Sequence, residues 1–315
     1  MKALIKHQTS GISEDRNKQK KVMTIQVTKY SASLHATFSH RSICRVHSVF
    51  DHTINVQCDQ RLIALTHKEA PLTPMGINLD VTDEMIRRMK VKKNDVLTID
   101  EKGLHLMNYS FALGHHQKID LSYPCYKGKM EDDALIAFKI HLDSLLLSTE
   151  DKGMLLASWK HVIYDQPIQQ SFYADHLVKL IRKIQKARSL SDVVDHVSSM
   201  VGAGEGLTPS GDDFIGGILA VLTYLSHDPP TAYVKSKLCN EVMQRIDQTT
   251  PISKEYLLYA MEGLFNELVS TLFIRHGEHK PYLHYLHKIS TIGHSSGVDF
   301  LIGMYFGLEI GGILQ

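Results

Sequence analysis

The segment VGAGEGLTPSGDDFIGGILAVL, residues 201–222, gathers at one predicted helix entrance the residue types best suited to chemistry. Three alternating glycines precede a polar turn that leads directly into an apolar helix. A glycine-rich loop at a helix N-terminus exposes backbone N–H groups beside the positive end of the helix dipole, and such groups bind phosphate or carboxylate. The sequence therefore predicts an anion site. Its backbone and hydroxyl donors would come from Gly204, Gly206, Thr208, Ser210 and Gly211.

Two carboxylates, Asp212 and Asp213, follow these donors and would compete with a bound anion for them. Their presence favours a ligand that also has N–H groups, or a step that involves a cation or a proton transfer. A plainer interpretation also stands. Ser210 followed three positions later by Asp213 matches a capping box, which simply begins a helix.

A second segment, SSGVDFLIGMYFGL at residues 295–308, repeats the pattern of the first. Glycines inside both helices would let their backbones approach closely, so we predict that the two helices pack together and that their entrances form one pocket. The alternative is chance similarity between two capped helices. The predicted catalytic residues are Asp212, Asp213 and Asp299, and the second segment adds Ser295, Ser296 and Gly297 to the predicted substrate-binding residues.

A third polar helix start, TTPIS at residues 249–253, lies between the two segments. We predict that Ser253 caps this helix, which would run over residues 253–275, and that Thr250 and Ser253 add hydroxyls to the same site. The alternative is ordinary helix initiation, because proline is common at the first position of a helix.

The chain contains 19 histidines, which raises the question of a metal site. The pair His276 and His279, in HGEH, lacks the H-E-x-x-H spacing that places two histidines on one helix face. The sequence also has no G-x-G-x-x-G after a strand and no P-loop lysine motif. We therefore predict neither a metal nor a cofactor.

The four cysteines, Cys44, Cys58, Cys125 and Cys239, lie far apart and include no C-x-x-C pair. This spacing fits neither a zinc ribbon nor a disulfide framework. We therefore predict buried or free thiols in a reducing compartment.

The overall composition limits the possible partners. The charges nearly cancel, 35 Lys and Arg against 34 Asp and Glu, so no global charge attracts nucleic acid or anionic lipid. No apolar run approaches the roughly 20 residues that span a bilayer. These features predict a cytoplasmic protein that binds neither nucleic acid nor membrane, and they favour a small neutral or anionic ligand or another protein.

The periodicity divides the chain into three parts. Residues 1–22 are polar and basic without periodicity and are predicted to form a disordered leader, or to be an upstream extension of the true start. Residues 23–127 contain short β-branched runs separated by turns. Residues 128–315 have apolar positions at three- and four-residue spacing. Strands followed by helices predict an α+β fold, with a small, mostly antiparallel β domain and a larger, all-helical C-terminal domain.

Taken together, GAGEGLTPSGDDFIGGILAVL, TTPIS, GHSSGVDFLIGMYFGL and the upstream VHSVFDHTINVQC resemble the family that contains the AllH subunit of oxamate carbamoyltransferase. The resemblance extends from about residue 24 to the C-terminus. It implies membership of a multi-subunit enzyme of anaerobic allantoin breakdown. That enzyme interconverts oxalurate plus phosphate with oxamate plus carbamoyl phosphate, so the implied partners are these small anions and the other subunits.

One departure limits the comparison with other carbamoyltransferases. Aspartate- and ornithine-type enzymes share an S-T-R-T-R phosphate loop, which this sequence lacks. Our first hypothesis is a carbamoyltransferase subunit with its anion and carbamoyl site at the two helix entrances. The alternatives are a non-catalytic subunit that binds a small anion or serves assembly, and a free-standing enzyme of another reaction class.

Overall fold

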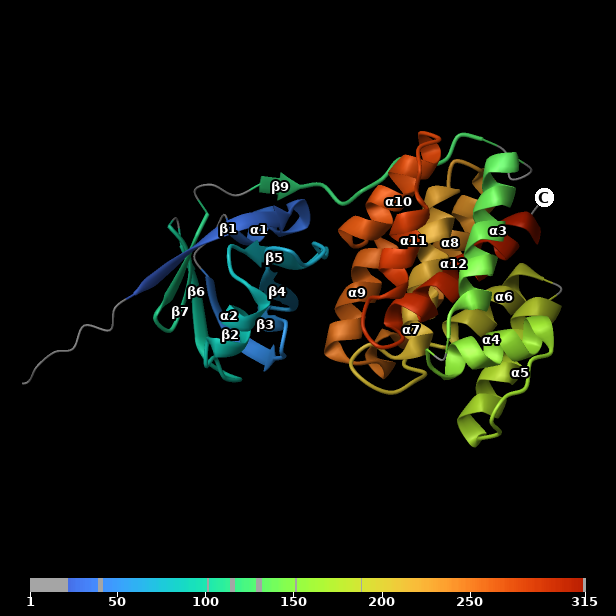
Figure 1. Ribbon diagram of the computed structural model, residues 1–315, viewed down its shortest axis with the longest axis horizontal. Helices are drawn as coiled ribbons and strands as arrows, with labels where there is room; N and C mark the ends of the chain where they lie inside the picture. Colours follow the sequence, from blue (N-terminus) through green and yellow to red (C-terminus); the bar gives the residue numbers. More distant parts are fainter. Residues whose placement is uncertain are drawn as a thin grey trace, which may run out of the picture.

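The computed structural model describes residues 22–38, 42–100, 102–113, 117–128, 132–150, 152–187 and 189–313. These residues form a β domain and a helical domain that lie side by side (Figure 1). The predicted leader, residues 1–22, lies outside the described residues except for Val22.

The β domain is a closed barrel. Eight strands are hydrogen-bonded in the order β5, β4, β3, β2, β6, β7, β8, β1, and pairing of β1 with β5 closes the ring. A ninth strand, β9, adds to β1 outside this ring. The strands are β1 (Met23–Ser31), β2 (Ser42–Val49), β3 (Thr53–Cys58), β4 (Arg61–His67), β5 (Gly76–Leu79), β6 (Val96–Asp100), β7 (Gly103–Leu106), β8 (Tyr109–Ala112) and β9 (Gln117–Ile119). Short helices accompany them, namely η1 (Ala32–Leu34), α1 (His35–Phe38) and α2 (Asp83–Arg88).

The predicted fold class, α+β with a small, mostly antiparallel β domain, is wrong for this part of the chain. The barrel is closed and of mixed strand direction, because β1 runs parallel to β8 and β4 runs parallel to β5. The other pairs within the ring are antiparallel, so the predicted pairing is correct in part. The alternation of apolar residues identifies strands but not their partners, and β1 and β8 are far apart in the sequence.

Cys44 on β2 and Cys58 on β3 form a disulfide, with their Cα atoms 4.6 Å apart. The antiparallel register, which pairs Arg45 with Gln57, places the two cysteines opposite each other. The prediction of four free thiols is therefore wrong for this pair and correct for Cys125 and Cys239. Because Cys44 and Cys58 are not free thiols, they no longer support the expectation of a reducing compartment.

The C-terminal part is built of helices. They are α3 (Asp133–Ser148), α4 (Met154–Tyr164), α5 (Phe172–Lys186), α6 (Leu190–Ser198), α7 (Ser210–Tyr224), α8 (Pro229–Arg245), η2 (Ile246–Gln248), α9 (Pro251–Met261), α10 (Glu267–Gly277), α11 (Leu283–Ser290) and α12 (Ser296–Ile313). The predicted boundary after residue 127 falls in the connection between β9 and α3 and stays a prediction. In the part of the chain that the structure describes, no helix is both long and apolar enough to cross a membrane.

The single helix predicted over residues 253–275 is two helices, α9 and α10. Gly263 has a φ of +81°, a left-handed conformation that ends α9. Asn266 then caps α10, because its side-chain oxygen accepts from the backbone N–H groups of Leu268 and Val269. Apolar spacing alone did not reveal this interruption.

α7 and α12 form the centre of the helical domain (Figure 1). Apolar side chains on all sides of both helices are buried, among them Phe214 and Leu219 of α7 and Leu301 and Ile302 of α12. A helix that is apolar all round requires neighbours on every side. The surrounding helices supply them, so the N-terminal ends of α7 and α12 are held inside the domain.

α9 and α10 lie on the side of the helical domain that faces the barrel (Figure 1). Leu62 and Ala64 of β4 pack with Ile252 and Tyr259 of α9 in one apolar cluster. Two ion pairs cross the same boundary, Arg61 with Glu255 and Lys29 with Glu267. The barrel therefore contacts the helical domain through α9 and α10.

Candidate functional site

α7 and α12 touch through their backbones. A Cβ atom at Gly217 would lie 1.9 Å from the carbonyl oxygen of Phe300, and one at Gly303 would lie 2.0 Å from the carbonyl oxygen of Phe214. Only glycine permits either approach. The prediction that the two helices pack against each other is confirmed by this reciprocal contact.

The two helix entrances are built alike. The N–H of Gly211 donates to the carbonyl of Ala203 at 2.7 Å, and the N–H of Gly297 donates to that of Ile292 at 3.0 Å. A Cβ atom at Gly211 would lie 2.0 Å from the carbonyl oxygen of Met200, and one at Gly297 would lie 1.8 Å from that of Ile289. We call residues 208–213 and 295–299 together the twin-helix mouth.

The backbone conformation explains why three alternating glycines precede α7. Gly202, Gly204 and Gly206 have φ angles of +73°, +133° and +91°, which L-residues rarely adopt. A Cβ atom at Gly206 would meet nothing within 4 Å, so conformation rather than space requires glycine there. The three glycines thus turn the chain back toward the start of α7.

The predicted capping box is wrong. Ser210 is already the first helical residue of α7, and Pro209 occupies the N-cap position without a side-chain hydrogen bond. Ser253 does not cap α9 either, because Thr250 Oγ1 accepts from the N–H of Ser253 at 3.1 Å. The N-cap residue of α7 thus supplies no side-chain cap, and backbone carbonyls of Ala203 and Pro209 accept from the first N–H groups of the helix instead.

Asp299 is fully buried in the twin-helix mouth, and Asp213 is half-buried there with its Oδ2 atom inaccessible to solvent. Burial raises the pKa of Asp213 well above its usual range, and the nearby Asp299 raises it further. Burial also raises the pKa of Asp299 to about 7. The two carboxyls therefore lie close together in a medium that disfavours their charge.

The hydroxyls around this pair come from both helix entrances. The hydroxyls of Ser296 and Thr208 partly offset the rise in the pKa of Asp213. Those of Ser210 and Ser295 do the same for the pKa of Asp299. Each carboxyl is thus influenced by a serine of the opposite helix. Thr208 Oγ1 and Ser296 Oγ also hydrogen-bond to each other at 2.8 Å, which joins the two halves of the mouth.

Three carboxylate oxygens in the mouth have no partner with hydrogen-bond geometry among the described residues, although hydroxyls lie near enough to lower the pKa of both carboxyls. They are Oδ2 of Asp213 and both Oδ1 and Oδ2 of Asp299. Asp299 is fully buried, with 0% of its surface exposed. Buried polar atoms without a partner are rare in folded proteins, so this cluster is the candidate position for a ligand.

Two tyrosines that sequence reasoning missed lie beside the carboxyls. The Tyr173 hydroxyl on α5 is buried without a hydrogen-bond partner in the described part of the chain, and burial and the nearby Asp299 raise its pKa. Burial and then Asp213 raise the pKa of Tyr256 on α9 to about 12. Aromatic residues at helical spacing suggest a core, so no sequence signal distinguished this pair.

Asp212 differs from its neighbour in the chain. Its Oδ1 accepts from the N–H of Gly202 at 2.8 Å, and its Oδ2 accepts from Thr249 Oγ1 and, at 2.7 Å, from Ser253 Oγ. These bonds tie the glycine loop to the start of α9. Asp212 therefore holds the fold at this position, with both of its oxygens occupied.

The predicted residues thus separate into groups. Those with side chains in the mouth are Thr208, Ser210, Asp213, Ser295, Ser296 and Asp299. Those that shape the backbone around it are Gly204, Gly206, Gly211 and Gly297. The third group supports the mouth from outside. Thr250 donates to the carbonyl of Leu207, and Ser253 donates to Asp212.

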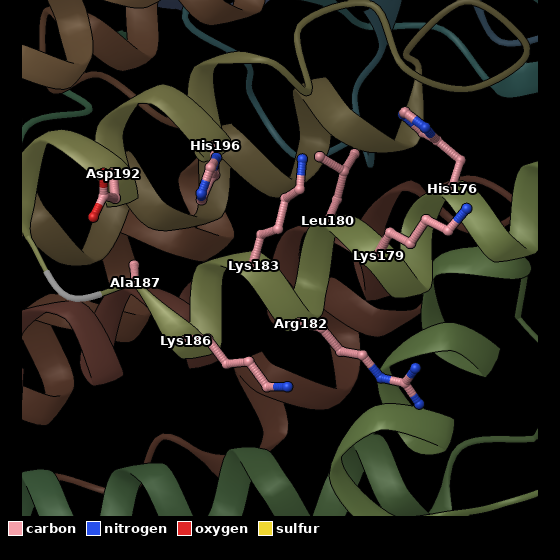
Figure 2. A pocket seen from close by; sticks show the side chains of 9 residues that line it. All are labelled: His176, Lys179, Leu180, Arg182, Lys183, Lys186, Ala187, Asp192 and His196. Carbon is pink, nitrogen blue, oxygen red and sulfur yellow. The ribbon is translucent and has the colours of Figure 1, made fainter.

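A separate groove between α5 and α6 is lined mainly by cationic side chains (Figure 2). Its lining residues are His176, Lys179, Leu180, Arg182, Lys183, Lys186, Ala187, Asp192 and His196. Arg182 and Lys186 point away from Lys183, so the cations do not converge on one point (Figure 2). None of these side chains has a buried atom that lacks a partner. The twin-helix mouth is therefore the better candidate.

Fold and site together define a class of protein: a closed β-barrel joined to a helical domain whose central helices present two buried carboxyls. Two family models match the chain. The model of the AllH family N-terminal domain matches residues 22–122, which include the barrel, and that of oxamate carbamoyltransferase subunit AllH matches residues 200–308, which include the mouth. The chain belongs to the AllH family. No solved structure matches it.

Proposed function

We propose that this chain is a subunit of a carbamoyltransferase of the oxamate carbamoyltransferase type, and that the twin-helix mouth binds the substrate. The reaction is conversion of oxalurate and phosphate to oxamate and carbamoyl phosphate. The observation that supports the proposal is the pair of buried carboxyls, Asp213 and Asp299, between two helix N-termini. The family description supports a role as one subunit among others.

The mouth offers complementary groups for a small carbamoyl anion. The hydroxyls of Ser210 and Ser296, which lie at the positive ends of the two helix dipoles, can donate to the anionic oxygens of the substrate. The free carboxylate oxygens of Asp213 and Asp299 can accept hydrogen bonds from its NH₂ group. A ligand with both kinds of group satisfies the mouth, whereas a simple anion does not.

In the proposed reaction a phosphate oxygen attacks the carbamoyl carbon, the bond from that carbon to the oxamate nitrogen breaks, and the proton of the phosphate passes to the departing nitrogen. The mouth contributes by orienting the two reactants and by stabilising the developing charge on the carbonyl oxygen. Asp212 has a positioning role here, because it fixes the glycine loop that precedes Ser210. The proposal includes a cytoplasmic location and no nucleic-acid or membrane partner, in keeping with the near-neutral net charge.

The test is reconstitution of the full chain with its partner subunits, followed by an assay of phosphate-dependent oxalurate cleavage. We expect Asp213→Asn and Ser210→Ala to lower kcat/KM by about 100-fold, the scale of losing one group that stabilises a transition state. Glu205→Gln is the matched control, because Glu205 lies in the same loop but is exposed. Full activity in both mouth variants contradicts a catalytic mouth. If those variants still lose oxamate binding, the chain is the non-catalytic anion-binding subunit of the alternative hypothesis.

A further inference from the structure

The twin-helix mouth has a charge imbalance. Its two carboxyls are influenced by hydroxyls and by other carboxyls, and no described Lys, Arg or His contributes to the pKa of either. A buried carboxylate normally has a cationic partner or a metal ion. An anionic substrate adds further negative charge to the same place. The helix N-termini offset part of this charge, since each is equivalent to roughly half a positive charge.

The side-chain groups that act on the two carboxyls are all oxygen groups. Three carboxylate oxygens lack a partner, and the hydroxyls beside them belong to Thr208, Ser210, Ser295 and Ser296. Carboxylate and hydroxyl oxygens suit hard cations such as Mg²⁺ rather than the softer metals that prefer nitrogen and sulfur. The sequence-based expectation of no metal rested on histidine spacing, which does not bear on an oxygen site.

The number of carboxylates also restricts the kind of site. The described residues contain no group of three or more His, Cys, Asp or Glu that could hold a metal ion, so the mouth is not a complete protein cage. Mg²⁺ is commonly held by one or two carboxylates, with substrate oxygens and water filling its remaining positions. Two carboxylates facing a place for an anionic substrate match that pattern.

We propose that Asp213 and Asp299 bind a divalent cation of the Mg²⁺ class, and that the anionic substrate supplies further oxygen ligands to it. One carboxylate comes from each central helix, so the cation is held only while α7 and α12 are packed together. The identity of the substrate rests on the proposed function, whereas the cation site rests on the carboxyl oxygens alone.

The experiment measures cation binding to the full chain directly. Mn²⁺ serves as the probe, followed by electron paramagnetic resonance and by calorimetry near pH 8, with and without oxamate, and with Mg²⁺ as competitor. We expect one Mn²⁺ per chain, displaced by Mg²⁺ and bound more tightly with oxamate. Asp213→Asn and Asp299→Asn should each weaken binding by at least the roughly tenfold that loss of even a supporting group costs at metal sites.

Glu205→Gln is the control, because it removes an exposed carboxylate of the same loop and should leave Mn²⁺ binding unchanged. Circular dichroism of each variant establishes that it is folded. Absence of stoichiometric Mn²⁺ binding with and without oxamate overturns the inference, as does equal binding by Asp299→Asn and the unaltered chain. Proton uptake on oxamate binding, without Mn²⁺, identifies the carboxyls as a proton-holding pair instead.

The outcomes distinguish the two proposals. Stoichiometric Mn²⁺ binding that depends on Asp213 and Asp299, together with no oxalurate cleavage by the reconstituted enzyme, contradicts the proposed function and leaves the cation site standing. Cleavage that depends on Asp213 and is undiminished by a chelator, together with no Mn²⁺ binding, contradicts only the cation site.

Discussion

Asp212 and Asp213 are consecutive residues of α7, yet their carboxylates are in opposite hydrogen-bonding states. Asp212 accepts hydrogen bonds from Gly202, Thr249 and Ser253, whereas Oδ2 of Asp213 is buried without a partner among the described residues. One residue type thus stabilises the fold at the first position and is available to a ligand at the next.

The two isosteric substitutions at these positions should change stability in opposite directions. Asp212→Asn loses charge-assisted hydrogen bonds and should lower the free energy of unfolding by about 2 kcal/mol. Asp213→Asn removes an ionisable carboxyl whose Oδ2 atom is buried without a partner, and should raise the free energy of unfolding by on the order of 1 kcal/mol. Urea unfolding in a buffer with a chelator measures both. A change of the same sign in the two variants contradicts this assignment.

Gly217→Ala should be far more damaging than Gly216→Ala. A Cβ atom at position 217 would lie 1.9 Å from backbone, and backbone cannot move aside, so we expect a loss of about 3 kcal/mol. At position 216 the nearest atom is the ring edge of Phe300 at 3.3 Å, and the gain of about 1 kcal/mol in helix propensity offsets a small shift of that ring. Thermal unfolding followed by circular dichroism compares the variants. Equal melting temperatures would show that the helices do not touch at Gly217.

Protonation of His276 should weaken the fold in mild acid. Burial lowers the pKa of His276 below its ordinary 6.5, and its ring nitrogens contact the Tyr224 hydroxyl at 2.8 Å and the Ala134 carbonyl at 3.1 Å. Because the unfolded chain takes up the proton first, this stability is present above about pH 6.5 and lost as pH falls through the lowered pKa. The effect reaches at most about 1.4 kcal/mol per pH unit.

Urea unfolding between pH 7.5 and pH 5.5 tests this expectation. His276→Gln should be less stable than the unaltered chain at pH 7.5, because it loses buried packing, but its stability should fall less steeply with pH. The same pH slope in both proteins would assign the acid sensitivity to another group.

Arg61→Ala should destabilise the contact between the barrel and the helical domain. The Glu255 side chain is only 4% exposed and is paired with Arg61, so the substitution leaves a buried carboxyl alone, at a cost of about 3 kcal/mol. The matched control is Arg88→Ala. Its ion pair with Glu84 is largely exposed on both sides and is worth well under about 1 kcal/mol. Urea unfolding of the full chain distinguishes the two, and comparable small losses would contradict the buried pair.

The sequence predicted the helical half and the packing of α7 against α12 well because their signals are local. Apolar spacing and repeated glycines in α7 and α12 indicated two buried helices, and their reciprocal contact at Gly217 and Gly303 follows from the same repeat. The barrel was predicted poorly because closure depends on β1 pairing with both β5 and β8. Such pairs between distant segments leave no pattern within either strand.

The same distinction applies within the candidate site. Asp213, Ser210, Ser296 and Asp299 belong to the two repeated segments, and their hydroxyls and carboxyls are visible in the sequence. Tyr173 and Tyr256 come from α5 and α9, so only the packing of whole helices brings them to the mouth. The hydrogen bonds of Asp212 could not be predicted from its own segment, because its partners Thr249 and Ser253 lie at another helix start.

The backbone contact between Gly217 and Gly303 acts as a fixed spacer between the two halves of the mouth. Since main chain rather than side chains sets the separation of α7 and α12, residues at the mouth can be exchanged without altering its width. Under the proposed function, size selection and chemical selection of the ligand would therefore be independent of each other. The first is set by glycines one to two turns inside the helices, and the second by the serines, threonine and aspartates at their ends.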